Sequence, residues 1–234
     1  MKANEYRGPD SRRVQQMFAG IAHRYDFLNH FLSISIDRHW RNFAVAKVRE
    51  LIPSPSRLCL DVCSGTGDLA IALRHTLAAT VVATDFCHPM LIRAAGKETS
   101  VPNVEADALK LPFRDGSFDA LTIAFGLRNL EDPIGGLGEF RRLLRPGGAV
   151  VILEFSKPVI PVLREAFGLY FRHILPRVGG IISGDAHAYQ YLHDSVVKFP
   201  NQKELMQLMQ AAGFQNVNYR NLSGGIAALH WGLA

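Results

Sequence analysis

The sequence has little cysteine, no long apolar run and no phosphate-binding loop of the Walker type. Its three cysteines are an odd number, and Cys59-x3-Cys63 lacks the ligand spacing of a zinc site, so we expect reduced thiols and no metal. A near-pure apolar run such as Ala149–Leu153 is far shorter than the roughly 18 residues that a membrane-spanning helix needs. The pattern G-x-x-x-x-G-K is absent, which argues against phosphoryl transfer.

What is present is an ordinary globular composition, with 48% hydrophobic and 20% charged residues, which excludes a disordered or fibrous chain. The first residues, 1–13, are polar and charged rather than a secretory signal, so we expect a cytoplasmic protein. The net charge of +5 suits nucleic acid, an anionic cofactor or an anionic membrane surface. Many cytosolic enzymes are equally basic, so charge alone selects none of these partners.

Apolar periodicity predicts an α/β protein. Residues 1–52 are expected to form a helical cap that ends at Pro53 and Pro55. Strand-like runs then alternate with helical patterns, which predicts a mostly parallel sheet with helices on both faces. The expected strands are 57–63, 80–84, 103–105, 118–125 and 149–155, and the expected helices are 69–77, 89–97 and 133–144, the last stopped by Pro146-Gly147-Gly148.

The alternation breaks at 157–199, a segment rich in Tyr, Phe and His that we interpret as a helical insertion. A helix over 201–212 follows, with Asn201 as N-cap, Glu204 completing a capping box and Gly213 after its end. Residues 214–219 and 226–231 are predicted to form an antiparallel pair at the sheet edge. We therefore expect one structural domain, in which 53–234 is the ligand-binding part and 1–52 covers it.

The most informative stretch follows the first expected strand and contains Asp61, Gly65, Thr66, Gly67 and Asp68. Ligands of open parallel sheets bind beyond the carboxyl ends of the strands, and glycines let the backbone approach them closely. An acid within the strand and another opening the helix disfavour a pyrophosphate and favour a cationic group, such as the amino group of a methionyl moiety. A tight turn without a ligand is the alternative.

Two further acids follow the next strands along the chain. Asp85 ends the second expected strand, where an acid can accept from both hydroxyls of a ribose. Asp107 follows the third and suits the exocyclic amine of adenine. Each could be an ordinary loop aspartate. Together with the glycine loop, the acids match S-adenosylmethionine (SAM) better than NAD or ATP.

Several longer motifs extend this match over nearly the whole chain. They are YDxLN at 25–29, FGLRN at 125–129, RLLRPGG at 142–148, LEFSKP at 153–158 and FPNQ at 199–202. With them the sequence resembles the class I SAM-dependent methyltransferases, and within that class the quinone C-methylases of menaquinone and ubiquinone biosynthesis. FGLRN joined to LEFSKP is specific, whereas the Pro-Gly-Gly part is widespread. Leu28 and Asp37 stand where the family usually has Met and His.

The resemblance implies a Rossmann-like class I methyltransferase sheet with an antiparallel edge strand, and SAM as methyl donor. It implies C-methylation of a polyprenylated quinol ring, first of all demethylmenaquinol to menaquinol. The alternatives are the benzoquinol methylation of ubiquinone biosynthesis, another small phenol or RNA, or a non-catalytic SAM-binding protein. The residues expected to bind the cofactor are Asp61, Gly65, Thr66, Gly67, Asp85, Asp107 and Ala108.

The catalytic candidates are Arg128, Asn129 and Tyr25. Arg128 stays protonated, so it can hold a developing phenolate or organise a water that takes the ring proton. Its alternative role is an ion pair with Asp85 or Asp107. Asn129 can orient Arg128 or the substrate oxygen, and Tyr25 either lines the pocket or packs in the cap.

The insertion supplies the remaining candidates. Tyr189, Tyr191 and His187 could cover the ring, although a structural role is favoured for each, and Cys63 is interpreted as structural. The stretch 159–176 mixes apolar and basic residues, which suits a helix packed in a homodimer or on the sheet, or a peripheral contact with the inner face of the membrane. No basic appendage indicates a nucleic-acid partner.

Overall fold

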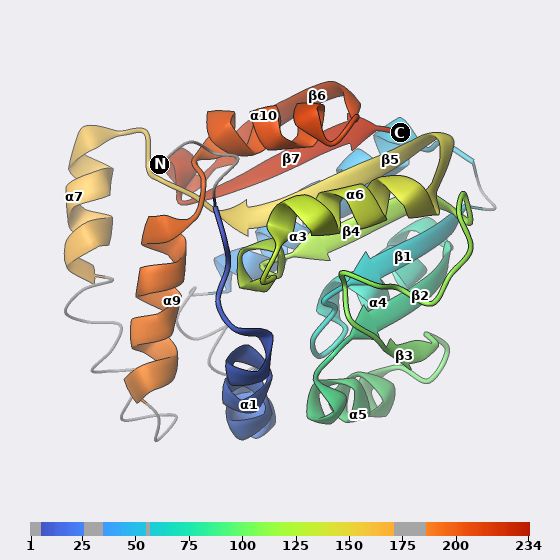
Figure 1. Ribbon diagram of the computed structural model, residues 1–234, viewed down its shortest axis with the longest axis horizontal. Helices are drawn as coiled ribbons and strands as arrows, with labels where there is room; N and C mark the ends of the chain where they lie inside the picture. The colour runs from blue at the N-terminus through green and yellow to red at the C-terminus, as the bar shows by residue number, and fades with distance from the viewer. Residues whose placement is uncertain (1–5, 26–34, 55–56, 171–185) are drawn as a thin grey trace.

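Figure 1 shows the computed structural model, in which residues 6–25, 35–54, 57–170 and 186–234 are described. Within these residues the chain forms a seven-stranded sheet in the order β3-β2-β1-β4-β5-β7-β6. The strands are β1 Leu58–Val62, β2 Thr80–Asp85, β3 Asn103–Glu105, β4 Phe118–Ala124, β5 Leu144–Phe155, β6 Gln215–Leu222 and β7 Ala227–Leu233.

The helices that surround the sheet follow the predicted alternation. They are α1 Ser11–Ile21, η2 Ala22–Arg24, α3 Ile36–Leu51, α4 Asp68–Leu77, α5 His88–Lys97, η3 Leu127–Asn129, α6 Pro133–Leu143, α7 Pro161–Leu169, α9 Ala186–Lys198, α10 Gln202–Ala211 and η5 Ser223–Gly225. None of the described helices is long and apolar enough to cross a bilayer.

Pairing within the sheet confirms the predicted fold class. Strands β3, β2, β1, β4 and β5 pair in parallel, whereas β7 runs antiparallel to β5 and β6 antiparallel to β7. The order of the strands reverses at β1, which lies between β2 and β4. This topological switch point places a crevice beyond the carboxyl ends of β1 and β4, where open α/β sheets bind ligands.

The core lies on both faces of the sheet because successive side chains of a strand point to opposite faces. Leu60 of β1 joins the buried cluster that contains Phe140 of α6. Its neighbour Cys59 joins the opposite cluster, with Val48 of α3 and Leu73 of α4. Helix α3 of the expected cap thus forms part of the core on the second face of the sheet. The division of the cap from residues 53–234 stays a prediction.

The start of β5 differs from the prediction. The strand begins at Leu144 rather than Ala149, so Pro146-Gly147-Gly148 lies within it instead of before it. Leu144 pairs with Phe118 of β4, and the register shifts before Ala149 pairs with Ala120. A residue that precedes proline favours extended backbone, and this conformation lets the strand begin directly after α6.

The end of the insertion agrees with the prediction. Asn201 accepts from the backbone N–H groups of Lys203 and Glu204, and Glu204 accepts from the Asn201 backbone, which completes the capping box of α10. Gly213 follows with φ 92°, a conformation that favours glycine. Residues 171–185 of the insertion and 26–34 of the YDxLN segment lie outside the described residues.

Candidate functional site

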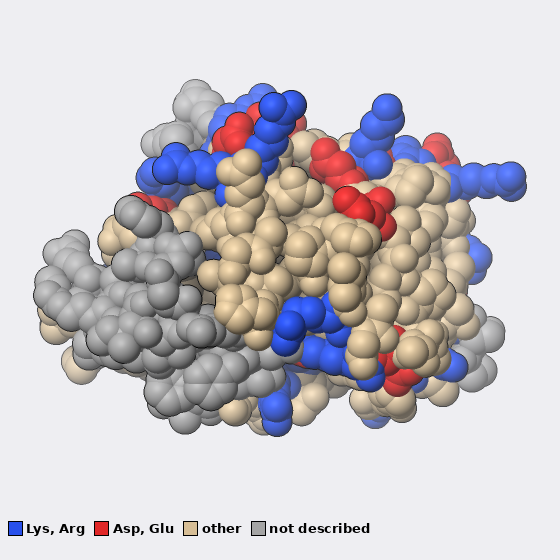
Figure 2. All heavy atoms as spheres, turned by 90° about the horizontal axis from the view of Figure 1, so that it is seen from below, with Lys and Arg blue, Asp and Glu red and all other residues tan. Residues whose placement is uncertain are grey.

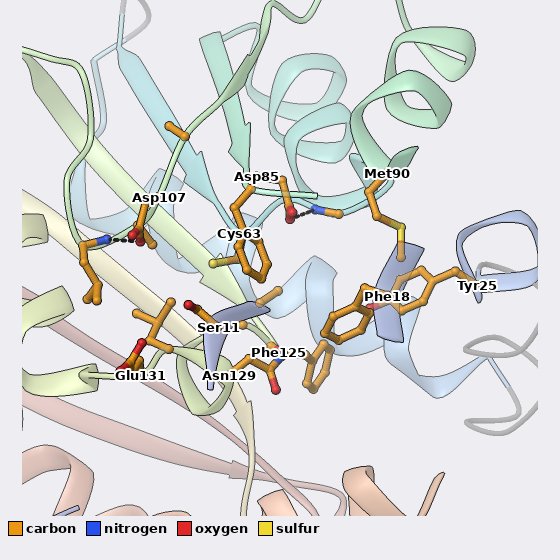
Figure 3. A pocket seen from close by; sticks show the side chains of 18 residues that line it. Ser11, Phe18, Tyr25, Cys63, Asp85, Met90, Asp107, Phe125, Asn129 and Glu131 are labelled. Carbon is orange, nitrogen blue, oxygen red and sulfur yellow. Dashed lines mark hydrogen bonds between the residues drawn. The ribbon is translucent and has the colours of Figure 1, made fainter. Parts of the chain in front are cut away.

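A pocket lies beyond the carboxyl ends of β1, β2 and β4, at the switch point (Figure 3). Asp107 lies on one side of it, Tyr25 and Phe18 lie on the opposite side, and Asp85 lies between them. The predicted site residues that line this pocket are Tyr25, Gly65, Asp85, Asp107, Ala108 and Asn129. Most of the residues predicted from motifs spread over the chain therefore meet in one place.

The other predicted residues support the pocket from behind. Asp61, Thr66 and Arg128 are buried, and none of them is among the lining residues. Gly67 is the N-cap of α4 and has φ 84°. A Cβ atom at this position would lie 3.2 Å from the Cβ atom of Ala94, so glycine allows α4 and α5 to approach at the end of the loop.

Asp85 links the glycine loop to the next strand. One of its carboxylate oxygens accepts from the Gly65 backbone N–H at 2.9 Å, and the other accepts from the Cys87 backbone N–H at 2.8 Å. Burial raises the pKa of Asp85 above its ordinary value, and these backbone hydrogen bonds oppose the rise. The carboxylate is thus held in a fixed orientation at the pocket wall.

Asp61 has unused capacity to accept a hydrogen bond. Thr122 Oγ1 donates to Asp61 Oδ1 at 2.6 Å. In the described part of the chain, neither Asp61 Oδ2 nor Ser64 Oγ has a hydrogen-bond partner, although both atoms are buried. Burial raises the pKa of Asp61 to about 7. Buried acceptors of this kind are usually satisfied, so the loop is suited to a donor from a ligand.

Asp107 and Ala108 form the part of the wall that follows β3. Asp107 is exposed, and its Oδ1 accepts from the Leu109 backbone N–H at 2.9 Å. Ala108 is 5% exposed and packs in the core beside it. The exposed carboxylate therefore stands at the rim of the pocket, next to a residue that is buried in the core.

Arg128 forms a buried ion pair with an acid that the sequence reasoning missed. Its Nη1 lies 2.6 Å from Glu154 Oε1, and the two side chains are 6% and 1% exposed. The alternative that paired Arg128 with Asp85 or Asp107 named the wrong partner. Register explains the correct one, because Ala124 of β4 pairs with Leu153 of β5, next to Glu154.

The ion pair is tied to the backbone on both sides. Glu154 accepts from the backbone N–H groups of Arg128 and Phe155, and Arg128 Nη1 also donates to the Phe125 carbonyl at 2.6 Å. The guanidinium carbon lies 5.2 Å from the centre of the Phe155 ring. Arg128 therefore acts on the pocket wall through Phe125.

Asn129 and Tyr25 have different surroundings. Asn129 Nδ2 donates to the Phe125 carbonyl at 3.2 Å, and Tyr191 of α9 donates from its hydroxyl to Asn129 Oδ1 at 2.7 Å. Tyr25 packs edge-on against Phe18, with 5.9 Å between ring centres. Tyr25 thus both lines the pocket and packs in the cap. The side chains of His187 and Tyr189 lie outside the described residues.

The sequence reasoning also missed part of the pocket lining. Phe18 of α1 and Met90 of α5 belong to one apolar cluster and both line the pocket. The only sequence signal was the helical pattern of each segment. Cys63, interpreted as structural, lines the pocket too, with φ 52°. Burial and neighbouring carboxylates raise its pKa well above the ordinary value, so it remains a thiol at neutral pH.

No group of three or more His, Cys, Asp or Glu side chains suited to a metal occurs among the residues that the structure describes. The polar side chains that line the pocket carry carboxylates, an amide, a phenol, a hydroxyl and a thiol. Carboxylates at the ends of β2 and β3 match the hydroxyls of a ribose and the amine of a base. The observed arrangement can therefore hold a nucleoside with a cationic substituent.

Comparison with known proteins agrees with this geometry. The ubiE/COQ5 methyltransferase family matches residues 6–234. A demethylmenaquinone methyltransferase of Deinococcus radiodurans is 48% identical over 92% of this chain and 90% of its own, and one of Thermus thermophilus is 47% identical over 92% and 99%. The ubiquinone/menaquinone biosynthesis C-methyltransferase of a Geobacter strain is 42% identical over 94% and 95%.

Solved structures of more distant proteins share the fold. A SAM-dependent methyltransferase of Thermotoga maritima superposes with a TM-score of 0.62 at 18% identity, over 93% of this chain and 98% of its own. One of Aquifex aeolicus superposes with a TM-score of 0.59 at 17% identity, over 81% and 88%. The match over nearly the full length and the identities above 40% show that this chain belongs to the ubiE/COQ5 family of SAM-dependent C-methyltransferases.

Proposed function

We propose that this enzyme methylates a ring carbon of a polyprenylated quinol, converting demethylmenaquinol to menaquinol. The observation that carries the proposal is that one pocket brings Asp85 and Asp107, at the ends of β2 and β3, together with Tyr25 and with Asn129 of the FGLRN loop. Relatives named demethylmenaquinone methyltransferase at 47% and 48% identity support the naphthoquinol ring. A relative named for both quinones makes benzoquinol the second candidate.

The residues present fit SAM. Asp85 would accept from the ribose hydroxyls, and Asp107 with Ala108 would meet the adenine. Asp61 Oδ2 and Ser64 Oγ, buried without a hydrogen-bond partner in the described part of the chain, would accept from the methionyl ammonium. When bound, SAM supplies an electrophilic methyl group.

The protein must favour electron density on the ring carbon of the acceptor. A quinone ring is electron-poor and does not attack a methyl group, whereas a quinol with phenolate character does. We assign to Asn129 a hydrogen bond to the acceptor oxygen and to Tyr25 a place against the ring. The buried Arg128, paired with Glu154 and 2.6 Å from the Phe125 carbonyl, holds this wall in place for that hydrogen bond. An arginine guanidinium donates hydrogen bonds and does not accept them, which suits Arg128 to hold this wall rather than to act as a base.

The test is a methyl-transfer assay with radiolabelled SAM. We expect label in the ring of reduced demethylmenaquinol and none in the oxidised quinone. Reduced 2-methoxy-6-polyprenyl-benzoquinol and RNA are the competing acceptors in parallel reactions. Label in RNA, or in no acceptor, would contradict the proposal. Accumulation of demethylmenaquinone in a host that lacks the gene would identify the ring independently.

On the face of the molecule shown in Figure 2, the pattern of charge favours a small acceptor over RNA. Figure 2 shows one face of the molecule, on which Lys and Arg side chains form separate groups interspersed with Asp and Glu, while uncharged side chains cover much of the centre. An RNA-binding face usually carries basic side chains in a continuous patch or stripe.

We propose further that α7 makes a peripheral contact with the membrane that dissolves the prenyl tail. One face of α7 packs inward, where Phe167 contacts Val196 of α9, as does Tyr170 directly after the helix. On the outward side, Val162 is 77% and Leu169 62% exposed. These two residues are seven positions apart and so share a helix face. Apolar side chains on both sides of one helix distinguish α7 from an ordinary surface helix.

Flotation with vesicles tests this contact. Lys157 and Arg164 are exposed near the apolar face, so we expect the protein to float with anionic vesicles at low salt and less so at high salt. Val162→Asp with Leu169→Asp should abolish flotation, whereas Ile92→Asp, an exposed apolar position on α5, should not. Absence of flotation would contradict the contact. A dimer that the double variant dissociates would instead show a homodimer interface.

A further inference from the structure

The orientation of the Asn129 amide is determined by its two partners. Asn129 Nδ2 lies 3.2 Å from the Phe125 carbonyl, and Asn129 Oδ1 lies 2.7 Å from the Tyr191 hydroxyl. A backbone carbonyl can only accept, so the amide nitrogen must be the atom that faces it. The amide oxygen therefore faces Tyr191, whose hydroxyl must donate.

The Phe125 carbonyl is itself firmly placed. It also accepts from Arg128 Nη1 at 2.6 Å, and Arg128 is held by Glu154. Phe125 has φ 58°, an uncommon conformation for a bulky residue, and its backbone N–H donates to the Leu153 carbonyl at 2.8 Å. Strained backbone of this kind is typical of functional sites. One side of the amide is thus anchored by the sheet.

Tyr191 anchors the other side from a distant part of the chain. It belongs to α9, whose neighbouring residue Leu192 packs in the cluster around Val196 together with Met17 and Ile21 of α1. Burial raises the pKa of Tyr191 to about 12, so its hydroxyl keeps its proton at neutral pH. In Figure 3 the Asn129 side chain forms the wall opposite Asp85, with its oxygen directed away from Asp85.

Among the described residues, these two anchors leave one Asn129 N–H group free to serve the pocket, since one amide hydrogen is used by Phe125 and the oxygen is used by Tyr191. An N–H donor binds an oxygen acceptor and strengthens its hydrogen bond as negative charge develops on that oxygen. We propose that Tyr191 is a positioning residue of the methyl transfer, which commits the Asn129 amide to donate to the oxygen of an acceptor with phenolate character. This inference rests on the proposed function and adds the group that selects the reactive form of the acceptor.

The first test is a kinetic double-mutant cycle. Tyr191→Phe removes only the hydroxyl, and we expect kcat to fall about tenfold, with KM for the quinol and Kd for SAM changed less than twofold. In the Asn129→Ala background, Tyr191→Phe should change kcat little, because the amide it orients is already absent. The matched control is Tyr219→Phe, a half-buried tyrosine of β6 that stacks on His230 and does not line the pocket. Independent, multiplying losses in the double variant would overturn the proposal.

The second test does not depend on any quinol. In a ¹⁵N-labelled protein, the chemical shifts of the two Asn129 carboxamide protons should change in Tyr191→Phe but not in Tyr219→Phe, because only the first variant removes the donor to Asn129 Oδ1. Unchanged resonances would show that Tyr191 does not hold the amide. If wild-type enzyme methylated no quinol while these resonances changed as expected, the proposed function would fail and the positioning of Asn129 would stand.

Discussion

In the Arg128→Ala variant, kcat on demethylmenaquinol is expected to fall by about 100- to 1,000-fold. This is the range found when one preorganised hydrogen-bond donor is removed from an active site. The guanidinium holds the Phe125 carbonyl, and through it the Asn129 amide that donates to the acceptor oxygen. Affinity for SAM should be roughly kept, because Arg128 does not line the pocket. Steady-state methyl transfer and calorimetric titration with SAM measure the two quantities separately.

The same substitution leaves the Glu154 carboxylate, 1% exposed, without its cation. Removal of one partner of a buried ion pair costs about 3–5 kcal/mol of the free energy of unfolding, so the assay requires a temperature at which circular dichroism shows the variant folded. Arg145→Ala is the control for loss of an arginine away from the site, since that arginine pairs with Asp119 near the starts of β4 and β5, at the opposite end of these strands from Arg128. An Arg128→Ala enzyme that works at the parent rate would refute the assignment.

The Asp85→Ala variant should bind SAM about 10- to 100-fold more weakly, whereas Arg128→Ala is expected to lower kcat and keep the affinity for SAM. Hydrogen bonds to a charged group contribute about 1.5–3 kcal/mol, and 1.4 kcal/mol corresponds to a factor of ten. The carboxylate also holds the backbone N–H groups of Gly65 and Cys87, so its loss loosens the glycine loop as well. Calorimetry with SAM at neutral pH gives the affinity directly.

Glu105→Ala provides the control for Asp85→Ala. Glu105 ends the neighbouring strand β3, pairs with His88 at 2.8 Å and does not line the pocket. It removes the same formal charge from the same edge of the sheet without touching the site. Equal SAM affinity in wild type and Asp85→Ala would contradict the role of Asp85 in binding the ribose. An equal loss of affinity in Asp85→Ala and Glu105→Ala would show only a general electrostatic effect.

Local sequence signals predicted the elements that carry the site. The strand 103–105, the helix that ends at Lys97 and the capping box of α10 were all predicted from short-range patterns. Asp85 and Asp107 were placed at the same edge because parallel strands end at one side of a sheet. Such features depend on propensity, periodicity and topology, all of which are expressed within a few residues.

Contacts between distant segments could not be predicted in the same way. Glu154 meets Arg128 only through the register that pairs Ala124 with Leu153, and a shift of one residue would turn the strand's side chains to the other face. The start of β5 at Leu144 likewise depends on pairing with Phe118 rather than on the Pro-Gly-Gly turn.

The sequence by itself determined the fold class, the glycine loop and the acids that would bind SAM. The alternation of strand and helix patterns indicates the fold class, and the loop and the acids directly follow predicted strands. The tertiary structure alone decided how Asn129 is oriented and how the apolar part of the pocket is formed. Docking of α9 brings Tyr191 to Asn129, and packing of α1 on α5 brings Phe18 to Met90. These contacts join helices far apart in the chain, so they depend on side-chain complementarity that no local pattern expresses.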